Sequence, residues 1–426
     1  MTSPHSIYER RESAVRSYCR SFPTSFVRAR NALLWDEEGR EYIDFLAGCS
    51  SLNYGHNDPD MKRALVEHLA GDGMGHALDF HTGPKAAFLE TFERLILRPR
   101  GMDHKVMMVG PTGTNAVEAA LKLARKVTGR ETVVAFTNGF HGMTLGALAA
   151  TGNEGKRAGA GMALPGVQRL PYEGAFGPGV DTLAQIEAMI ENPSSGLDHP
   201  AAFLVEPVQG EGGLNVASRE WLEGLARIAK KHGILLILDD IQAGIGRTGT
   251  FFSFEEYDIA PDMVPLAKSL SGFGLPFAAL LVKPEHDLWK PAEHNGTFRG
   301  NTHAFVTAKV ALEKFWGDDR FRNEVQAKAD YLNMRLARIA AMLPEGQVKG
   351  RGFMQGVDVG SGELAAAICA ECFERGLIIE TSGAHDEVVK VLAPLTIEKE
   401  ILAKGLDILE GAVAAHVAPS SRLAAE

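Results

Sequence analysis

The sequence predicts an α/β protein with a mostly parallel, doubly wound sheet and a second, smaller α+β domain. In the middle of the chain, short apolar runs alternate with amphipathic stretches, an order that places parallel strands between two layers of helices. After about residue 310 the pattern changes, because a long helical stretch precedes several shorter strands. The length of 426 residues also suffices for two or more domains that each bury a core.

The first 60 residues are expected to join the smaller domain. Within them, residues 32–45 have the pattern of a β-hairpin, with a turn at Glu38 and Gly39. Residues 61–310 are expected to form the large domain. Its main elements follow in the order strand 106–109, helix from about 116, strand 132–136, strand 202–206, helix 221–231 and strand 234–238.

Residues 311–426 are expected to form the rest of the smaller domain. A helical stretch covers roughly 304–342, and a final helix runs from about 398 to 417. Between them, short strands are expected near 353–359, 377–380 and 388–392. This mixture of helices and short strands is typical of an α+β unit.

Composition and charge exclude several classes of function. A net charge of −10 argues against nucleic acid and anionic membranes as partners. No apolar run approaches the roughly 20 residues of a membrane-spanning helix, and the N-terminus lacks the apolar core of a secretory signal. Four cysteines do not make a disulfide framework, so we expect a cytoplasmic enzyme. Cys369 and Cys372 are expected to lie on a helix over 363–375 and not in a metal site.

The apolar strand at 234–238 ends in two acids, Asp239 and Asp240. In an open parallel sheet, ligands bind beyond the carboxyl ends of the strands. An acid at this place can bind a ligand, cap a helix or hold a metal ion, and the pair alone does not decide between these roles.

Lys268 follows later in the chain, within the stretch PLAKSLSGFG. Most lysines are solvated, but small residues flank this one, and apolar runs at 263–266 and 277–282 precede and follow it. Burial lowers the pKa of a lysine and frees its neutral amine to form an imine. The residues around Lys268 therefore favour a partly buried, reactive amine.

A Gly/Thr-rich turn, GPTGTNAVE at 110–118, leads directly into a helix, with Asn115 and Glu118 at the spacing of a capping box. Free backbone N–H groups at a helix start bind phosphate groups. The turn lacks the lysine of a Walker motif, so a nucleotide P-loop is not expected.

A phosphate site, an amine and a carboxylate are together what pyridoxal 5′-phosphate (PLP) requires. Asp239 would keep the pyridine nitrogen of PLP protonated, and Lys268 would bind its aldehyde. The same lysine would then act as general base and acid. We therefore expect PLP as the cofactor, Lys268 and Asp239 as the catalytic residues, and no metal.

Four longer motifs carry a resemblance to a known family. The chain resembles the class III, or ω-amino-acid, aminotransferases of fold type I over nearly its whole length, in VEPVQGEGG, LDDIQAGIGRTG, NGFHGMTLGALAATG and GTFRGN. Further stretches are similar to members that form L-2,4-diaminobutyrate for ectoine biosynthesis: SFP, REYIDFLAG, LNYGHN, PTGTNAVEAA, DDIQAG, SLSGFGLPFA and NGTFRG.

The resemblance implies cofactor contacts at particular residues. Asp239 would pair with the pyridine nitrogen, and Gln242 would hydrogen-bond the phenolic oxygen. Phe140 would stack on one face of the ring, and Ile241 would pack on the other.

The resemblance also implies a phosphate site shared between subunits. Gly113 and Thr114 would bind the phosphate, and Thr297 of a neighbouring subunit would complete the site. The active unit is therefore expected to be at least a homodimer.

Substrate contacts are expected from Glu206, Glu211, Arg299 and Lys390. In related enzymes, the acid at the position of Glu211 pairs with a basic residue when no α-carboxylate is bound. Lys390 stands where relatives usually carry arginine, and a lysine cannot grip a carboxylate through two parallel hydrogen bonds. Met143 stands where GABA-type relatives have arginine, which argues against GABA as a substrate, and Arg299 is expected to supply the missing charge.

The resemblance implies a two-step transamination of small amino and oxo acids. Glutamate would leave as 2-oxoglutarate, and L-aspartate 4-semialdehyde would become L-2,4-diaminobutyrate. A Lys390 that swings between Glu211 and a substrate carboxylate would allow both substrates to bind. The alternatives are another ω-aminotransferase (for ornithine, acetylornithine or a diamine), a PLP-dependent aminomutase or racemase, and a non-catalytic protein of the same fold.

Overall fold

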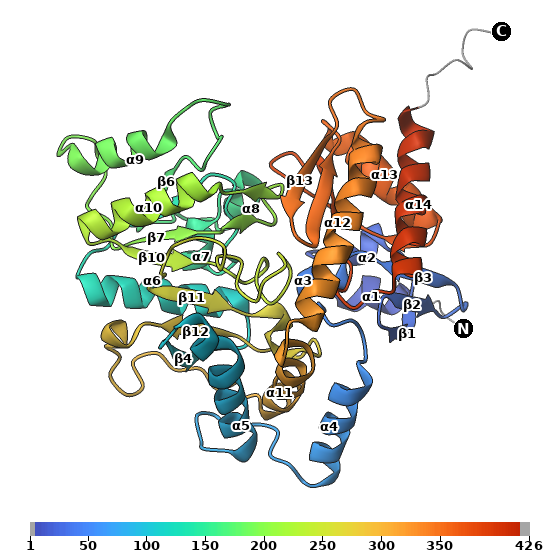
Figure 1. The fold of residues 1–426 in the computed structure, drawn as a ribbon, viewed down its shortest axis with the longest axis horizontal. Coiled ribbons are helices and arrows are strands. Elements are labelled where there is room, and N and C mark those ends of the chain that lie inside the picture. The colour runs from blue at the N-terminus through green and yellow to red at the C-terminus, as the bar shows by residue number, and fades with distance from the viewer. Residues whose placement is uncertain (1–4, 418–426) are drawn as a thin grey trace.

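The computed structural model describes residues 5–417, which form two lobes (Figure 1). The larger lobe contains the middle of the chain. In the smaller lobe, the N-terminal strands lie beside the C-terminal helices, at the right of Figure 1. The division of the chain at residues 60 and 310 stays a prediction.

The larger lobe is built on a seven-stranded sheet, and its mostly parallel order confirms the predicted α/β fold. Among the described strands of this sheet, β12 is antiparallel to both of its neighbours, and the other pairs are parallel. In order across the sheet, the strands are β4 (Lys105–Met108), β12 (Ala279–Val282), β11 (Met263–Leu266), β10 (Leu235–Leu238), β7 (Ala202–Val205), β5 (Val133–Phe136) and β6 (Val167–Leu170).

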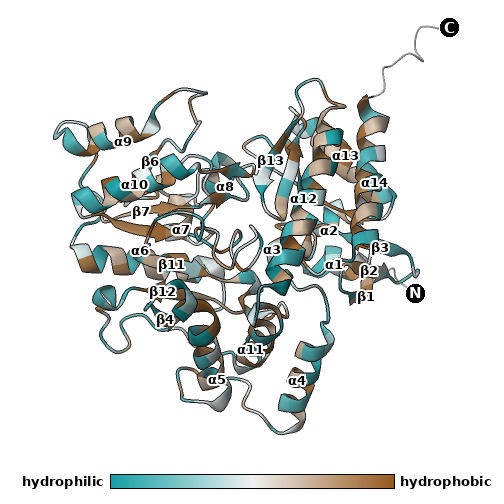
Figure 2. Cartoon of the chain, viewed as in Figure 1, coloured by the Kyte–Doolittle hydropathy of each residue, from teal (hydrophilic) through white to brown (hydrophobic). Residues whose placement is uncertain are grey.

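The two faces of this sheet are buried against different helices. Successive residues of a strand point to opposite faces. Leu235 and Ile237 pack in one core cluster with helix α6 (Gly113–Thr128). Leu236 and Leu238 pack in another cluster, with α10 (Arg219–His232), α5 (Gly83–Phe92) and α11 (Thr302–Trp316). Strands buried on both faces read as continuous apolar runs, which is why the sequence shows them clearly and why they are brown in Figure 2.

The smaller lobe contains two four-stranded sheets. The first joins distant parts of the chain, because β15 pairs in parallel with β3 of the N-terminal hairpin. Its strands are β1 (Phe26–Arg30), β2 (Leu33–Asp36), β3 (Glu41–Asp44) and β15 (Leu377–Ile378). The second is antiparallel, with the order β13 (Gln347–Arg351), β14 (Met354–Asp358), β17 (Val388–Val391) and β16 (Glu380–Ser382).

The helical stretch predicted over 304–342 is two helices. α11 ends at Trp316 and α12 (Arg320–Ala340) begins after Asp319, because Gly317 is a poor helix former and Asp318 accepts a hydrogen bond from the Arg320 amide. The remaining helices are α1 (His5–Arg11), α2 (Tyr18–Ser21), α3 (Ala47–Ser50), α4 (Pro59–Ala70), α7 (Leu145–Ala150), α8 (Glu154–Ala158), α9 (Thr182–Glu191), α13 (Gly362–Glu374) and α14 (Lys399–Val417).

Short helical turns and one small ribbon complete the described elements. The turns are Glu93–Leu97, Arg98–Arg100, Lys268–Ser271 and Pro284–His286, and the ribbon pairs β8 (Val208–Gln209) with β9 (Asn215–Val216). Within residues 5–417, none of the helices has the length and apolar character required to cross a membrane.

Candidate active site

The candidate active site is a cavity of about 490 Å³ at the carboxyl end of the large sheet. Loops that follow β4, β5, β7, β10 and β11 supply its walls, which is why residues far apart in the sequence meet there. Of the residues predicted from the sequence, the cavity brings together Gly113, Thr114, Phe140, Glu206, Glu211, Asp239, Ile241, Gln242 and Lys268.

Asp239 enters the cavity directly after β10 and is held there by two hydrogen bonds. His141 Nδ1 lies 2.7 Å from Asp239 Oδ2, and the Ile241 amide donates to Oδ1 at 3.2 Å. Burial opposes a charge on His141, but the hydrogen bond to Asp239 and its negative charge outweigh burial and raise the pKa of His141. His141 was not predicted from the sequence, although it lies beside Phe140 in the same motif.

Asp240 has a structural role. It is fully buried, does not line the cavity, and accepts hydrogen bonds from the Ser253 hydroxyl and amide. Burial raises the pKa of Asp240 to about 7. The structure thus assigns different roles to the two adjacent acids: Asp239 faces the cavity, and Asp240 holds the loop that follows β10.

Lys268 follows β11 in a strained backbone conformation, with a φ of +51° that residues other than glycine rarely adopt. Its ammonium group makes no hydrogen bond or ion pair with any described residue. Burial lowers the pKa of Lys268, although the negative charge of Glu211 opposes this effect. An amine with a lowered pKa at the base of a cavity is suited to react with an aldehyde.

The N-terminus of α6 opens into the same cavity. Gly113 and Thr114 are its first two residues, and the N-cap residue Thr112 makes no capping hydrogen bond through its side chain. The amide groups of this first turn therefore remain available to an anion, and the helix dipole favours a negative charge there.

The capping box expected from Asn115 and Glu118 does not form, so this expectation was wrong. The Glu118 carboxylate instead accepts hydrogen bonds from Thr144 Oγ1 at 2.5 Å and from the Ala147 amide at 3.0 Å. A neighbouring helix, α7, competes for the carboxylate, which the local sequence cannot reveal.

Phe140 and Ile241 both line the cavity, and so does Gln242. Gln242 donates a hydrogen bond to Glu211 Oε1 at 3.1 Å, but its own Oε1 is buried and lacks a partner among the described residues. A buried amide oxygen of this kind normally has a hydrogen-bond partner, which a ligand in the cavity would provide.

Glu206 lies under Phe140 and supports it. Its carboxylate accepts hydrogen bonds from the Phe140 amide at 2.9 Å and from the Gly210 amide at 3.4 Å. Burial raises the pKa of Glu206 to about 7, with a further contribution from the charge of Asp239. Both oxygens are thus engaged with the backbone, which favours a supporting role for Glu206 over the predicted contact with substrate.

Glu211, Lys390 and Glu380 form a charged cluster at one wall of the cavity. Lys390 Nζ lies 2.9 Å from Glu211 Oε1 and 3.1 Å from Glu380 Oε1. The side chain of Lys390 is 0% exposed and does not line the cavity, whereas Glu211 does. Glu380 was not predicted; its only signal in the sequence is an acid that follows the apolar run LII.

Thr297 and Arg299 do not reach the cavity of their own chain. Thr297 is exposed, and the Arg299 guanidinium pairs with Asp79 at a different cavity. Both lie on one loop, so a contribution to catalysis would require a second subunit. Met143, where GABA-type relatives have arginine, lines the cavity and is 55% exposed.

These residues fit PLP. The free amides at Gly113 and Thr114 suit its phosphate, the carboxylate of Asp239 suits its ring nitrogen, and Lys268 suits its aldehyde. Gly113 is also required by space, since a Cβ atom there would lie 3.0 Å from Ile241 Cδ1.

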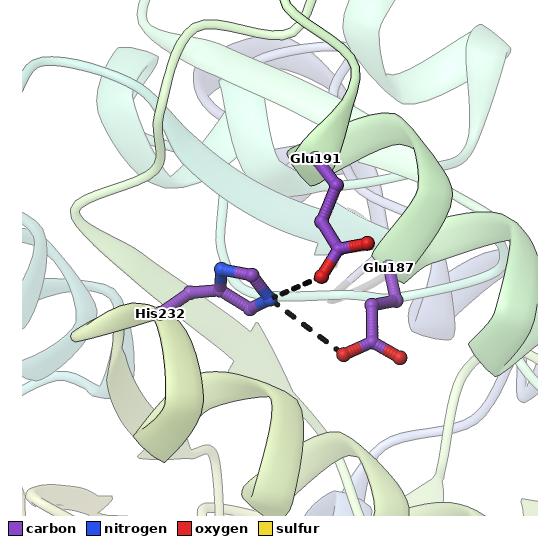
Figure 3. Close-up of side chains that lie close together, drawn as sticks. All are labelled: Glu187, Glu191 and His232. Carbon is purple, nitrogen blue, oxygen red and sulfur yellow. Dashed lines mark ion pairs between the residues drawn. The ribbon is translucent and has the colours of Figure 1, made fainter.

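A second cluster, of Glu187, Glu191 and His232, lies between α9 and α10 (Figure 3). His232 Nε2 is 3.6 Å from an oxygen of each glutamate. The Lys231 ammonium, however, already bridges the same two oxygens, at 2.8 Å and 2.7 Å. Because this cation already lies between the two carboxylates, the cluster is an ion-pair network, and nothing in it indicates a metal.

Cys369 and Cys372 lie on α13, as predicted, and neither forms a disulfide. Burial raises the pKa of both thiols. Raised pKa values disfavour the thiolate that redox and metal chemistry need, so the two residues are packing groups on a helix.

Comparison with known proteins gives one consistent result. The family described as "Aminotransferase class-III" matches residues 16–413. Several relatives carry the name "Diaminobutyrate--2-oxoglutarate transaminase". The one from Halomonas elongata is 56% identical over 409 residues, covering 95% of this chain and 97% of that protein. The one from Vibrio cholerae is 55% identical over 406 residues, covering 95% and 98%.

Two solved structures with the same fold carry the names of other transaminases. The ornithine aminotransferase from Toxoplasma gondii aligns with a TM-score of 0.83 at 25% identity, covering 97% of this chain and 94% of that one. An (S)-enantioselective omega-transaminase from Thermomicrobium roseum aligns with a TM-score of 0.83 at 26% identity, covering 98% and 99%.

Proposed function

The chain belongs to the class III aminotransferases, and we propose that it exchanges amino groups between L-glutamate and L-aspartate 4-semialdehyde. The products are 2-oxoglutarate and L-2,4-diaminobutyrate, and the reaction is reversible. The observation that carries this proposal is the identity of 52–56% to relatives whose name states diaminobutyrate and 2-oxoglutarate as substrates. We place the reaction at the start of ectoine biosynthesis.

The enzyme is a PLP-dependent transaminase. When bound, PLP supplies a protonated ring that withdraws electrons from the bond to be broken. Asp239 would place its carboxylate at the ring nitrogen, and His141 keeps that carboxylate oriented. Lys268 would accept and return a proton, and its lowered pKa suits this exchange.

The charges around the cavity match the two substrates. Glutamate presents an α-carboxylate beside its reacting amine, whereas diaminobutyrate, which reacts at its terminal amine, does not. Glu211 faces the cavity and Lys390 lies behind it, so the wall presents a carboxylate when Glu211 is in place and a cation when it is not. Met143 offers no charge where GABA-type relatives hold the carboxylate distal to the reacting amine, which is unfavourable for GABA, and the distal carboxylate of glutamate is assigned to Arg299.

Separate half-reactions test the proposal. The PLP-loaded enzyme is mixed with glutamate, diaminobutyrate, ornithine or GABA, and the change of the cofactor spectrum is followed. We expect glutamate and diaminobutyrate to react, and ornithine and GABA to be slower by at least about tenfold. Faster reaction with ornithine than with diaminobutyrate would assign the chain to another ω-amino substrate. Turnover without consumption of 2-oxoglutarate would instead indicate an aminomutase.

We also propose that the working unit is at least a homodimer in the cytoplasm. Thr297 is exposed, and the neighbouring Phe298 is 65% exposed, although both lie in a motif that the family uses at the phosphate site. The partner subunit's Thr297 would complete that site, and Arg299 would come close to the same substrate. A monomeric mass in solution contradicts the dimer, and unchanged glutamate kinetics in Arg299→Ala contradicts the role of Arg299.

A further inference from the structure

Lys390 is a buried cation that two strands hold in place. It lies on β17, between β14 and β16 in the antiparallel sheet of the smaller lobe. Its side chain is 0% exposed. A buried ammonium group needs a nearby negative charge, because burial without one is strongly unfavourable.

Glu380 supplies that charge from the neighbouring strand. Glu380 and Lys390 are directly opposite each other in the register of β16 and β17, and Glu380 Oε1 lies 3.1 Å from the ammonium. The contact is an ion pair without the alignment of a hydrogen bond. Because the sheet fixes both backbones, this pair does not depend on the loop that carries Glu211.

Glu380 is itself held on the side away from Lys390. The Tyr18 hydroxyl, from α2, donates to Glu380 Oε2 at 3.4 Å, and Cys49 Sγ lies 3.9 Å from the same oxygen. The N-terminal segment therefore keeps the Glu380 carboxylate directed at Lys390.

Glu211 is placed differently. It lies on the turn after β8, next to Gly210 and Gly212, and it faces the cavity. It shares Lys390 with Glu380, so the cluster contains two carboxylates and one ammonium group. Loss of Glu211 from this cluster would still leave Lys390 with one carboxylate.

We propose that Glu380 is the permanent counter-ion of Lys390, which leaves Glu211 free to move away and admit the α-carboxylate of glutamate. In this arrangement Glu211 moves and Lys390 stays, contrary to the swinging lysine expected from the sequence. Without Glu380, Glu211 would be the sole partner of a buried cation. Its movement would then cost more free energy, because it would leave the ammonium group unpaired. Glu380 is thus a positioning residue. By holding Lys390 in place, it makes Glu211 the side chain that moves when one substrate replaces the other. This inference rests on the proposed function.

A double-mutant cycle tests the shared counter-ion without measuring activity. Thermal unfolding is compared for the holoenzyme and for Glu211→Gln, Glu380→Gln and the double variant. We expect the melting temperature of each single variant to fall by a few degrees. The melting temperature of the double variant should fall by about twice the sum of the two single decreases. Adding Lys390→Met to the double variant should recover most of the loss, because no buried cation then remains. Additive losses, or no recovery with Lys390→Met, would overturn the proposal.

Half-reactions test the motion of Glu211. In Glu380→Gln, the spectral change with glutamate should slow by about tenfold, while the change with diaminobutyrate should vary by less than about twofold. Glu371→Gln, which removes a surface ion pair with Arg375 on α13, is the control and should alter neither rate. Equal slowing of both half-reactions would contradict the proposal. Absence of any reaction with diaminobutyrate in the unaltered enzyme would refute the proposed substrate, and the thermal cycle would still decide the role of Glu380.

Discussion

At the scale of single residues, Glu206 shows how burial in the site affects stability. Its pKa is raised from 4.5 to about 7, chiefly by burial, although two backbone amides oppose this shift. Because the folded protein holds this proton more tightly than the unfolded chain, the resulting stability is present below pH 4.5 and is lost as the pH rises to about 7. Glu206 thus makes the folded protein more stable at slightly acidic pH than at neutral pH.

We predict that Glu206→Gln removes about one proton from the pH dependence of unfolding. Between pH 5 and pH 7, the unaltered apoenzyme should lose up to about 1.4 kcal/mol per pH unit more than the variant does, and about half as much near pH 7, where Glu206 is already half ionised. Unfolding midpoints of both proteins across this range measure the difference. Parallel profiles for the two proteins would show that Glu206 titrates normally. Asp240 contributes a similar slope in both proteins and therefore cancels in the comparison.

At the scale of elements, the start of α6 combines two requirements in one residue. Gly113 provides a free amide for an anion, and its missing side chain leaves room for Ile241, since a Cβ atom would lie 3.0 Å from Cδ1 and 3.1 Å from Cγ2. Such contacts are tighter than ordinary packing, so Ile241 would have to shift toward the cavity.

We predict that Gly113→Ala weakens PLP binding and leaves the apoenzyme stable. In the apoenzyme, Ile241 relieves the contact by shifting into the cavity, and PLP must reverse this shift at a cost of about 1–3 kcal/mol, which corresponds to roughly 5- to 150-fold weaker binding. Titration of the apoenzyme with PLP measures this affinity. Gly83→Ala is the matched control, because Gly83 also begins a helix, α5, and a Cβ atom there meets nothing within 4 Å. Equal PLP affinity in both variants would exclude the steric argument.

The same elements explain what the sequence could and could not predict. The sequence predicts Lys268, Asp239 and Gly113 because each follows a strand end or begins a helix, and these elements are visible in the local sequence and place the residues at the sheet edge. His141 and Glu380 matter through partners distant in the chain: Asp239 lies 98 positions from His141, and Lys390 meets Glu380 only when β16 and β17 pair. Long-range contacts of this kind leave no periodic signal in one sequence.

At the scale of the whole molecule, one buried arginine joins parts of the chain that lie far apart. Arg247, which is 0% exposed, follows β10 of the large sheet. Its guanidinium donates to Asn53 Oδ1 at 2.6 Å, to the Ala393 carbonyl at 2.7 Å and to the Phe353 carbonyl at 3.2 Å. Since Asn53 precedes the larger lobe in the chain and the two carbonyls belong to the C-terminal part, Arg247 joins the two lobes.

We predict that Arg247→Met uncouples the lobes. The change removes the hydrogen bonds that the guanidinium donates to Ser50 Oγ, Asn53 Oδ1 and the two carbonyls, and it leaves the buried carbonyls of Phe353 and Ala393 without this donor. Hydrogen bonds to a charged group contribute about 1.5–3 kcal/mol each, so a loss of roughly 3 kcal/mol or more is expected. Calorimetry of the apoenzyme should then show two transitions where the unaltered protein shows one, because each lobe has its own sheets.

Arg130→Met is the control: Arg130 also donates to two carbonyls, of Pro200 and Gly233, but within the larger lobe alone. It should lower the melting temperature without splitting the transition, and a split there as well would show that the effect does not arise at the junction of the lobes. Cooperative unfolding of Arg247→Met would mean that apolar packing alone joins the lobes.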